Sequence, residues 1–84
     1  MKGSPPRVAA AEAIASIREY TQAGVRILGV DGFTIVPEGF RADHDLMLDV
    51  SNRPMTAEDA AAESVAFIND HARRDVIWEV WTDE

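Results

Sequence analysis

The hydrophobic pattern of this 84-residue chain changes at Gly24. Before Gly24, apolar side chains recur at helical spacing along one stripe, which includes Ala10, Ala13, Ile14 and Ile17. After it, apolar residues form short blocks or alternate with polar ones, as they do in strands. A second helical pattern follows Thr56, and a last apolar block begins near Val76. The pattern predicts one α+β domain over residues 1–84, in which helices pack on a sheet.

The first helix is expected within "SPPRVAAAEAIASIREYTQAG", residues 4–24. Ser4 is a suitable N-cap, and Pro5 or Pro6 is tolerated in the first turn, where no backbone N–H is needed. Gly24 suits the left-handed residue that ends many helices. The sequence therefore predicts an amphipathic helix with one buried stripe.

Three strands are expected between the two helices. Asp31-Gly32 separates "VRILGV" from "FTIVP", and this dipeptide favours a type I′ hairpin turn because both turn residues need positive φ. After a loop at "EGFRAD", the segment "HDLMLDVS" alternates. This alternation directs Leu46, Leu48 and Val50 to one face of the third strand and Asp45, Met47 and Asp49 to the other.

The second helix and the last strand complete the predicted fold. Thr56 and Asp59 form a variant of the capping box, and the strand "DVIWEVWTD" follows the helix. The predicted order is αβββαβ, with a four-stranded mixed sheet and both helices on one face. The second helix makes strands three and four a right-handed, parallel βαβ unit. Strand four is expected beside strand three or strand one, and the sequence does not choose between these positions.

The two tryptophans, Trp78 and Trp81, are three positions apart and so point to opposite faces of a strand. Val76, Trp78 and Val80 form the more apolar row and are assigned to the core. The other face is expected to form a recognition surface with an apolar centre and an acidic rim. Its predicted partner-binding residues are Asp45, Met47, Asp49, Ile77, Glu79, Trp81 and Asp83. An alternative is that Trp81 packs under the edge of the first helix or over the chain terminus.

No catalytic, metal or cofactor motif stands out. The chain has no cysteine, which excludes disulfides and thiolate sites and favours a cytoplasmic setting. Within "DHD", His44 would point away from Asp43 and Asp45, so these residues would not converge on one ion. The serines lack a nucleophile elbow, and no glycine-rich loop with a lysine could cradle phosphates. A chain this small is also expected to have little room for a pocket of about 300 Å³ or more. No enzyme activity and no cofactor are therefore predicted.

The formal net charge of −7, from fifteen acidic and eight basic residues, limits the choice of partner. Direct nucleic-acid binding needs concentrated Lys and Arg, which this composition lacks. No apolar run reaches the ~18 residues of a membrane span. Acidic charge serves solubility, and it also steers a protein toward a basic partner.

The predicted function is a non-enzymatic binding domain that occludes a basic, nucleic-acid-binding site on a partner protein or nucleoprotein complex. In size, charge and lack of catalytic equipment, the chain resembles small acidic phage inhibitors such as anti-CRISPR proteins, and toxin-immunity proteins. Carboxylates on a rigid surface imitate the phosphates that a basic groove attracts. One alternative is a structural module that self-associates, as a homodimer for example, through the sheet face or the edge of strand four. A small enzyme or ligand carrier is the other.

Overall fold

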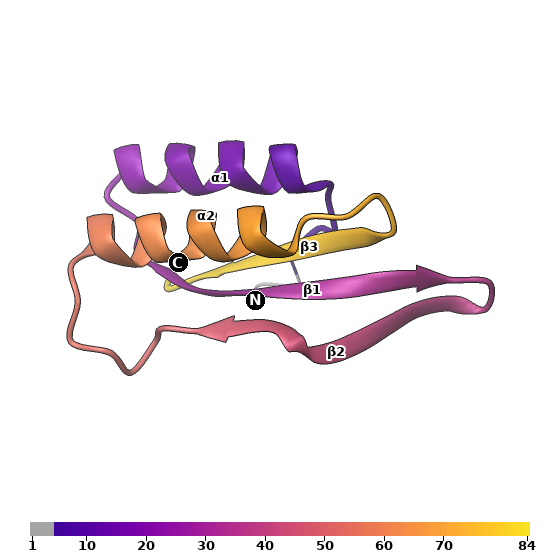
Figure 1. Cartoon of the computed structure of the whole chain (residues 1–84). Coiled ribbons are helices and arrows are strands. Elements are labelled where there is room, and N and C mark those ends of the chain that lie inside the picture. The colour runs from indigo at the N-terminus through magenta and orange to yellow at the C-terminus, as the bar shows by residue number, and fades with distance from the viewer. Residues whose placement is uncertain (1–4) are drawn as a thin grey trace.

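The computed structural model describes residues 5–84, in which two helices and three strands follow the order α1–β1–β2–α2–β3. The strands form one sheet in the order β2–β1–β3, and both helices lie on one of its faces (Figure 1). The elements are α1 Ala10–Gln22, β1 Ile27–Val36, β2 Gly39–Asp49, α2 Ala57–His71 and β3 Val76–Thr82. The α+β class and the alternation of helix, strands, helix and strand agree with the prediction.

The predicted four-stranded mixed sheet is wrong, because the sheet within residues 5–84 has three strands and every pairing is antiparallel. The predicted strands one and two are a single strand, β1, which pairs with β2 on one side and with β3 on the other. β2 and β3 run in the same direction, but β1 separates them. The α2 connection therefore crosses over the central strand instead of joining adjacent parallel strands.

Gly32 explains why Asp31-Gly32 is not a turn. A Cβ at this position would lie 2.8 Å from Leu46 Cβ and 3.0–3.1 Å from the ring of Trp78. The glycine therefore makes room for the indole against the middle of β1, a use of glycine that is common inside strands. The hairpin turn lies instead at Pro37 and Glu38, where Gly39 has a φ of 137°. That conformation is accessible mainly to glycine.

A large bulge bends β2 near its middle (Figure 1). Asp31 pairs with Met47 and Phe33 pairs with Ala42, so residues 43–46 of β2 lie opposite Gly32 alone. Asp43 Oδ1 accepts a hydrogen bond from the backbone N–H of Asp45 at 3.0 Å. The triplet Asp43-His44-Asp45, which the sequence predicts to alternate along a strand, is therefore part of this bulge.

The first helix begins later than predicted, at Ala10, and its N-cap Ala9 makes no side-chain cap. Ser4, the predicted N-cap, lies outside the described residues. Val8 forms an isolated antiparallel bridge with Trp78, joined by backbone hydrogen bonds of 2.9 and 2.7 Å. Residues before α1 thus run beside the outer edge of β3. The end of the helix matches the prediction, because Gly24 has a φ of 79°.

The second helix confirms its predicted start. Thr56 Oγ1 accepts a hydrogen bond from the N–H of Asp59 at 3.1 Å. The helix ends at His71.

The core lies between the helices and the sheet. Its largest fully buried side chain is Trp78, which meets Phe67 edge to face with ring centroids 6.1 Å apart. Val76 and Val80 are buried with Trp78, which confirms the row of β3 assigned to the core. Trp81 belongs to the opposite row of β3, so it lies on the face of the sheet that α1 and α2 do not cover.

Candidate partner-binding face of the sheet

Within residues 5–84, no helix covers the outer face of the sheet, which is the face opposite α1 and α2 (Figure 1). Residues that pair directly across strands share a face, so the register identifies its members. One row across the three strands consists of Met47, Asp31 and Glu79, and the next consists of Asp49, Gly29 and Trp81. A further row joins Ala42, Phe33 and Ile77. The outer face is therefore a mixed acidic and apolar surface.

Trp81 is the anchor of one end of the outer face. The residue is 38% exposed, and its indole Nε1–H donates a hydrogen bond to Asp31 Oδ2 at 3.0 Å. This bond joins β3 to β1 and holds the ring in one orientation. A half-exposed tryptophan with a fixed polar edge is pre-organised for binding, because little side-chain entropy remains to be lost.

A concavity of about 250 Å³ lies beside this indole, and we call it the Trp81 hollow. A Cβ at Gly29 would collide with the carbonyl oxygen of Leu48, so close backbone contact between β1 and β2 requires glycine there. The residues that line the hollow are Leu28, Gly29, Asp31, Leu48, Asp49, Ser51 and Trp81.

The two carboxylates of the hollow have opposite pKa shifts. Burial raises the pKa of Asp31 above 3.8; the Trp81 hydrogen bond opposes this rise, and the negative charges of Glu79 and Asp49 add to it. Hydrogen bonds from the hydroxyl and the backbone N–H of Ser51 lower the pKa of Asp49. Asp49 is therefore held as an anion, while Asp31 lacks a compensating positive charge.

Arg26 fixes the loop that follows Asp49. Its guanidinium donates to three carbonyl oxygens of the β2–α2 loop, those of Val50, Arg53 and Met55. The backbone N–H of Arg26 also bonds to Asp83 Oδ1, at 3.3 Å. Three of its five N–H donors bond to backbone carbonyls and, within residues 5–84, it forms no ion pair with Asp31 or Asp49, so this arginine stabilises the edge of the hollow without neutralising it.

The part of the outer face that extends from Glu79 toward the hairpin carries an arginine of its own. Arg7 Nε lies 3.0 Å from Glu79 Oε2, and the guanidinium carbon lies 4.2 Å from the centroid of the Phe33 ring and 5.1 Å from that of Phe40. We call these four residues the Arg7 cluster. The residue Glu79 is only 5% exposed, and its charge is compensated by a planar cation stacked against aromatic rings.

The structure brings together part of the predicted set. Met47, Asp49 and Trp81 lie in the two rows around Asp31. Asp83 is exposed just beyond β3 and bonds to the backbone of Arg26. Of the remaining three, Asp45 lies in the bulge of β2 and Ile77 is half-buried opposite Phe33. Glu79 lies directly opposite Asp31, but its carboxylate is paired with Arg7.

The sequence patterns do not identify four residues of this face: Asp31, Arg7, Phe33 and Phe40. The Asp31-Gly32 dipeptide predicts a turn, and a residue in a turn belongs to neither face of the sheet. An uninterrupted strand through Gly32 would have put Asp31 and Phe33 on one face, and Pro37 followed by Glu38 and Gly39 was the competing turn signal. Nothing in the sequence indicates that Arg7 lies over the sheet.

Exposed charge is unevenly distributed along the sheet. Arg41 pairs with Thr34, which also pairs with Val76, so Arg41 and the exposed Arg73 and Arg74 lie toward the hairpin end. Exposed acids at the opposite end include Asp49, Asp83 and Glu84. Each end also carries charge of the other sign: Glu38 and Asp75 lie at the hairpin end, and Arg26 and Arg53 lie at the end that holds Trp81. The Trp81 end is the more acidic of the two, because the carboxylates of Asp31, Asp49, Asp83 and Glu84 outnumber its two arginines.

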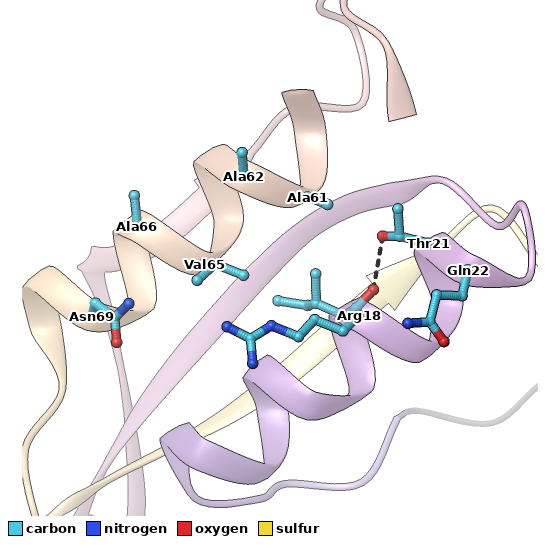
Figure 2. Close-up of a pocket in the computed structure, with 9 residues that line it drawn as sticks. Arg18, Thr21, Gln22, Ala61, Ala62, Val65, Ala66 and Asn69 are labelled. Atoms are coloured by element: carbon cyan, nitrogen blue, oxygen red, sulfur yellow. Dashed lines mark hydrogen bonds between the residues drawn. The ribbon is translucent and has the colours of Figure 1, made fainter. Parts of the chain in front are cut away.

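A second concavity lies on the helical side of the molecule. A groove of about 570 Å³ runs between α1 and α2, and the Arg18 side chain extends toward α2 (Figure 2). Thr21 Oγ1 donates back to the carbonyl oxygen of Ile17 at 2.8 Å. The prediction that so small a chain lacks a pocket of this size is wrong, because alanines on α2 leave the helices apart on their outer side. The lining residues are Ile17, Arg18, Thr21, Gln22, Ala61, Ala62, Val65, Ala66 and Asn69.

Other kinds of site find no support in residues 5–84. No group of three or more histidine, aspartate or glutamate side chains is arranged to hold a metal ion there. In the same part of the chain, no helix is long and apolar enough to cross a membrane. Comparisons with known protein families, with curated proteins and with solved structures find no match to this chain.

Proposed function

We propose that this protein is a non-enzymatic inhibitor that binds a basic partner protein through the acidic end of its outer face. The observation that carries the proposal is Trp81, half exposed on a sheet face without helices and held by Asp31. Tryptophan is among the residues most enriched at the energetic centres of interfaces. In this proposal the bound domain covers a surface that its partner uses for nucleic acid.

The charges around Trp81 favour a basic partner over a neutral one. Asp49 and Asp83 lie at the same end of the sheet as Asp31, whereas Arg41, Arg73 and Arg74 lie toward the other end. The two arginines near Asp49 have other partners, because Arg26 bonds to backbone carbonyls and Arg53 pairs with Glu63. An acidic patch attracts a basic groove over long range, which raises the association rate and makes it sensitive to salt. The net charge of −7 acts in the same direction.

Self-association remains a second candidate because of the hairpin end. Ile35 and Phe40 pair across β1 and β2 and are 46% and 53% exposed. Two such faces could pack together as an isologous dimer. The outer edge of β3 is a poorer route, because Val8 already pairs with Trp78 there.

The test is an affinity capture at low salt from cells in which the protein naturally acts, followed by binding measurements on the purified partner. Wild type should retain a basic nucleic-acid-binding protein, and affinity should fall at least tenfold between ~50 and ~200 mM salt. Trp81→Ala should lose the partner, whereas Phe40→Ala, an exposed aromatic at the other end of the same face, should keep it. Nucleic acid should compete with the protein for the partner.

A charge-matched pair of variants separates a specific patch from net charge. Asp31→Asn with Asp49→Asn removes two charges from the outer face, and Glu12→Gln with Asp70→Asn removes two exposed charges from the helices. Only the first pair should weaken binding. Equal weakening by both pairs, or a complex that is insensitive to salt, would contradict the proposal. Loss of a stable dimer in Phe40→Ala would favour self-association instead.

A further inference from the structure

The geometry points to a specific occupant for the Trp81 hollow: the guanidinium of an arginine exposed on the partner protein, lying against the indole and paired with Asp31 and Asp49. This inference rests on the proposed function and names the chemical group that the site recognises. It follows from three observations, which are the Arg7 cluster, the free carboxylate oxygens in the hollow, and the exposed indole.

The Arg7 cluster shows how this face accommodates an arginine. There, one carboxylate, that of Glu79, binds the guanidinium at 3.0 Å, and two aromatic rings contact its faces. The Trp81 hollow offers the same kinds of group, an aromatic ring and carboxylates, on the same face of the sheet. Within residues 5–84, the ion pairs are Arg7–Glu79 and Arg53–Glu63, so neither carboxylate of the hollow is in one.

The hydrogen bonds of the hollow leave acceptors for such a group. Asp31 uses Oδ2 for Trp81, and Asp49 uses Oδ1 for Ser51. No hydrogen bond within residues 5–84 engages Asp31 Oδ1 or Asp49 Oδ2. A guanidinium has five N–H donors arranged as a fork, and so it can bond to both carboxylates at once.

Arginine fits these groups better than lysine does. The guanidinium is planar and weakly hydrated, so it stacks on an indole while it donates hydrogen bonds in its own plane. An ammonium is a compact, strongly hydrated charge without a planar face to stack on the indole. The raised pKa of Asp31 is consistent with a carboxylate that still lacks its cation.

The test titrates ¹⁵N-labelled protein with blocked arginine, N-acetyl-arginine-N-methylamide, and follows the indole N–H resonance of Trp81, identified by its absence in Trp81→Phe. Blocked arginine should shift this resonance with a Kd on the order of millimolar, typical of a single side chain. The uncharged citrulline analogue should bind at least about tenfold more weakly, and blocked lysine should bind more weakly than arginine. Those results would support an arginine pocket.

Two double variants provide the matched control. Asp31→Asn with Asp49→Asn should weaken blocked arginine about tenfold, because both charge-assisted bonds are lost while the amides still accept from Trp81 and Ser51. Glu12→Gln with Asp70→Asn should leave the titration unchanged.

Each contrary outcome has a distinct meaning. Equal shifts with citrulline, stronger binding of lysine, tighter binding of Ca²⁺, or shifts centred on Phe33 and Phe40 would each overturn the inference. A shift of the Trp81 resonance with protein concentration alone would identify a second copy as the occupant. If the basic partner binds through Trp81 but the pocket shows no selectivity for arginine, only this inference fails. If arginine binds but no basic partner exists, the proposed function fails alone.

Discussion

Two neighbouring parts of the outer face, the Arg7 cluster and the Trp81 hollow, use similar groups to different effect. In the Arg7 cluster, Glu79 is 5% exposed and its carboxylate is paired with an arginine from the segment before α1. In the Trp81 hollow, Asp31 and Asp49 lie beside an indole that is 38% exposed, and no ion pair within residues 5–84 includes them. The difference is the source of the cation: the chain itself supplies it in the Arg7 cluster, and in our proposal the partner protein supplies it in the Trp81 hollow.

This difference separates stability from binding. A buried carboxylate is tolerated only with a partner, so the pairing of Arg7 with Glu79 is expected to matter for folding. Carboxylates near the surface retain solvent and cost little, so Asp31 and Asp49 are available for a cation supplied by another molecule. Substitutions in the Arg7 cluster should therefore reduce stability, and substitutions in the Trp81 hollow should reduce binding.

Removal of Arg7 is expected to have the largest effect. Arg7→Ala leaves the Glu79 carboxylate buried without a cation and also removes the contacts with Phe33 and Phe40, so the free energy of unfolding should fall by about 2 kcal/mol. Trp81→Ala, in the Trp81 hollow, should cost less than about 1 kcal/mol. Denaturant unfolding of both variants measures the difference.

A charge-neutral rescue identifies the cause of that loss. Glu79→Gln added to Arg7→Ala should recover part of the stability, because an amide is cheaper to bury than an unpaired carboxylate. Equal destabilisation by Arg7→Ala and Trp81→Ala would contradict the proposed difference between the Arg7 cluster and the Trp81 hollow. So would a double variant that is no more stable than Arg7→Ala alone.

A cation introduced beside Asp31 should change the free energy of unfolding less than removal of Arg7 does, and it should stabilise the fold instead of destabilising it. Met47 pairs with Asp31 across β1 and β2 and is 36% exposed. Met47→Arg should place a cation beside Asp31 and raise the free energy of unfolding by about 0.5 kcal/mol, as a cross-strand opposite-charge pair does. The same variant should block binding of the partner, because the hollow then has its own cation.

Met47→Gln is the control for Met47→Arg, since it removes the thioether without adding charge. Met47→Gln should neither stabilise the fold nor block binding of the partner. Undiminished partner binding by Met47→Arg would show that Asp31 does not contribute to the binding surface.

The pH dependence of Asp31 should give the smallest effect. Its raised pKa means that the folded chain holds the Asp31 proton more tightly than the unfolded chain does. Stability is therefore lost as pH rises from the ordinary value of 3.8 through the raised pKa, since the ion is then partly buried and lies near the charges of Glu79 and Asp49. Asp31→Asn avoids this loss and retains an acceptor for Trp81, so it should be more stable than wild type by a few tenths of a kcal/mol at pH 7.

Unfolding curves between pH 3 and pH 8 measure this effect. The advantage of Asp31→Asn over wild type should shrink toward zero below pH 3.8, the ordinary pKa of the carboxyl. A constant difference across this range would mean that Asp31 ionisation is not coupled to folding.

Much of the local structure could be predicted from short-range signals. The Thr56 cap, the left-handed Gly24 and the inward row of Val76, Trp78 and Val80 depend only on neighbouring residues and on the period of a helix or strand. The strand count could not be predicted, because Asp31-Gly32 fits a hairpin turn equally well. The glycine in mid-strand is explained by Leu46 and by the indole of Trp78, which is more than forty positions away.

The sequence alone determined which side chains of β3 point together, and hence that Trp78 and Trp81 lie on opposite faces of their strand. Tertiary structure decided which carboxylates remain free. Glu79 and Asp31 pair across β3 and β1, yet one is paired with Arg7 and the other is hydrogen-bonded to Trp81. These contacts join segments 50 and 72 positions apart, and no local pattern encodes them, because they depend on the register of the strands and on the path of the chain before α1.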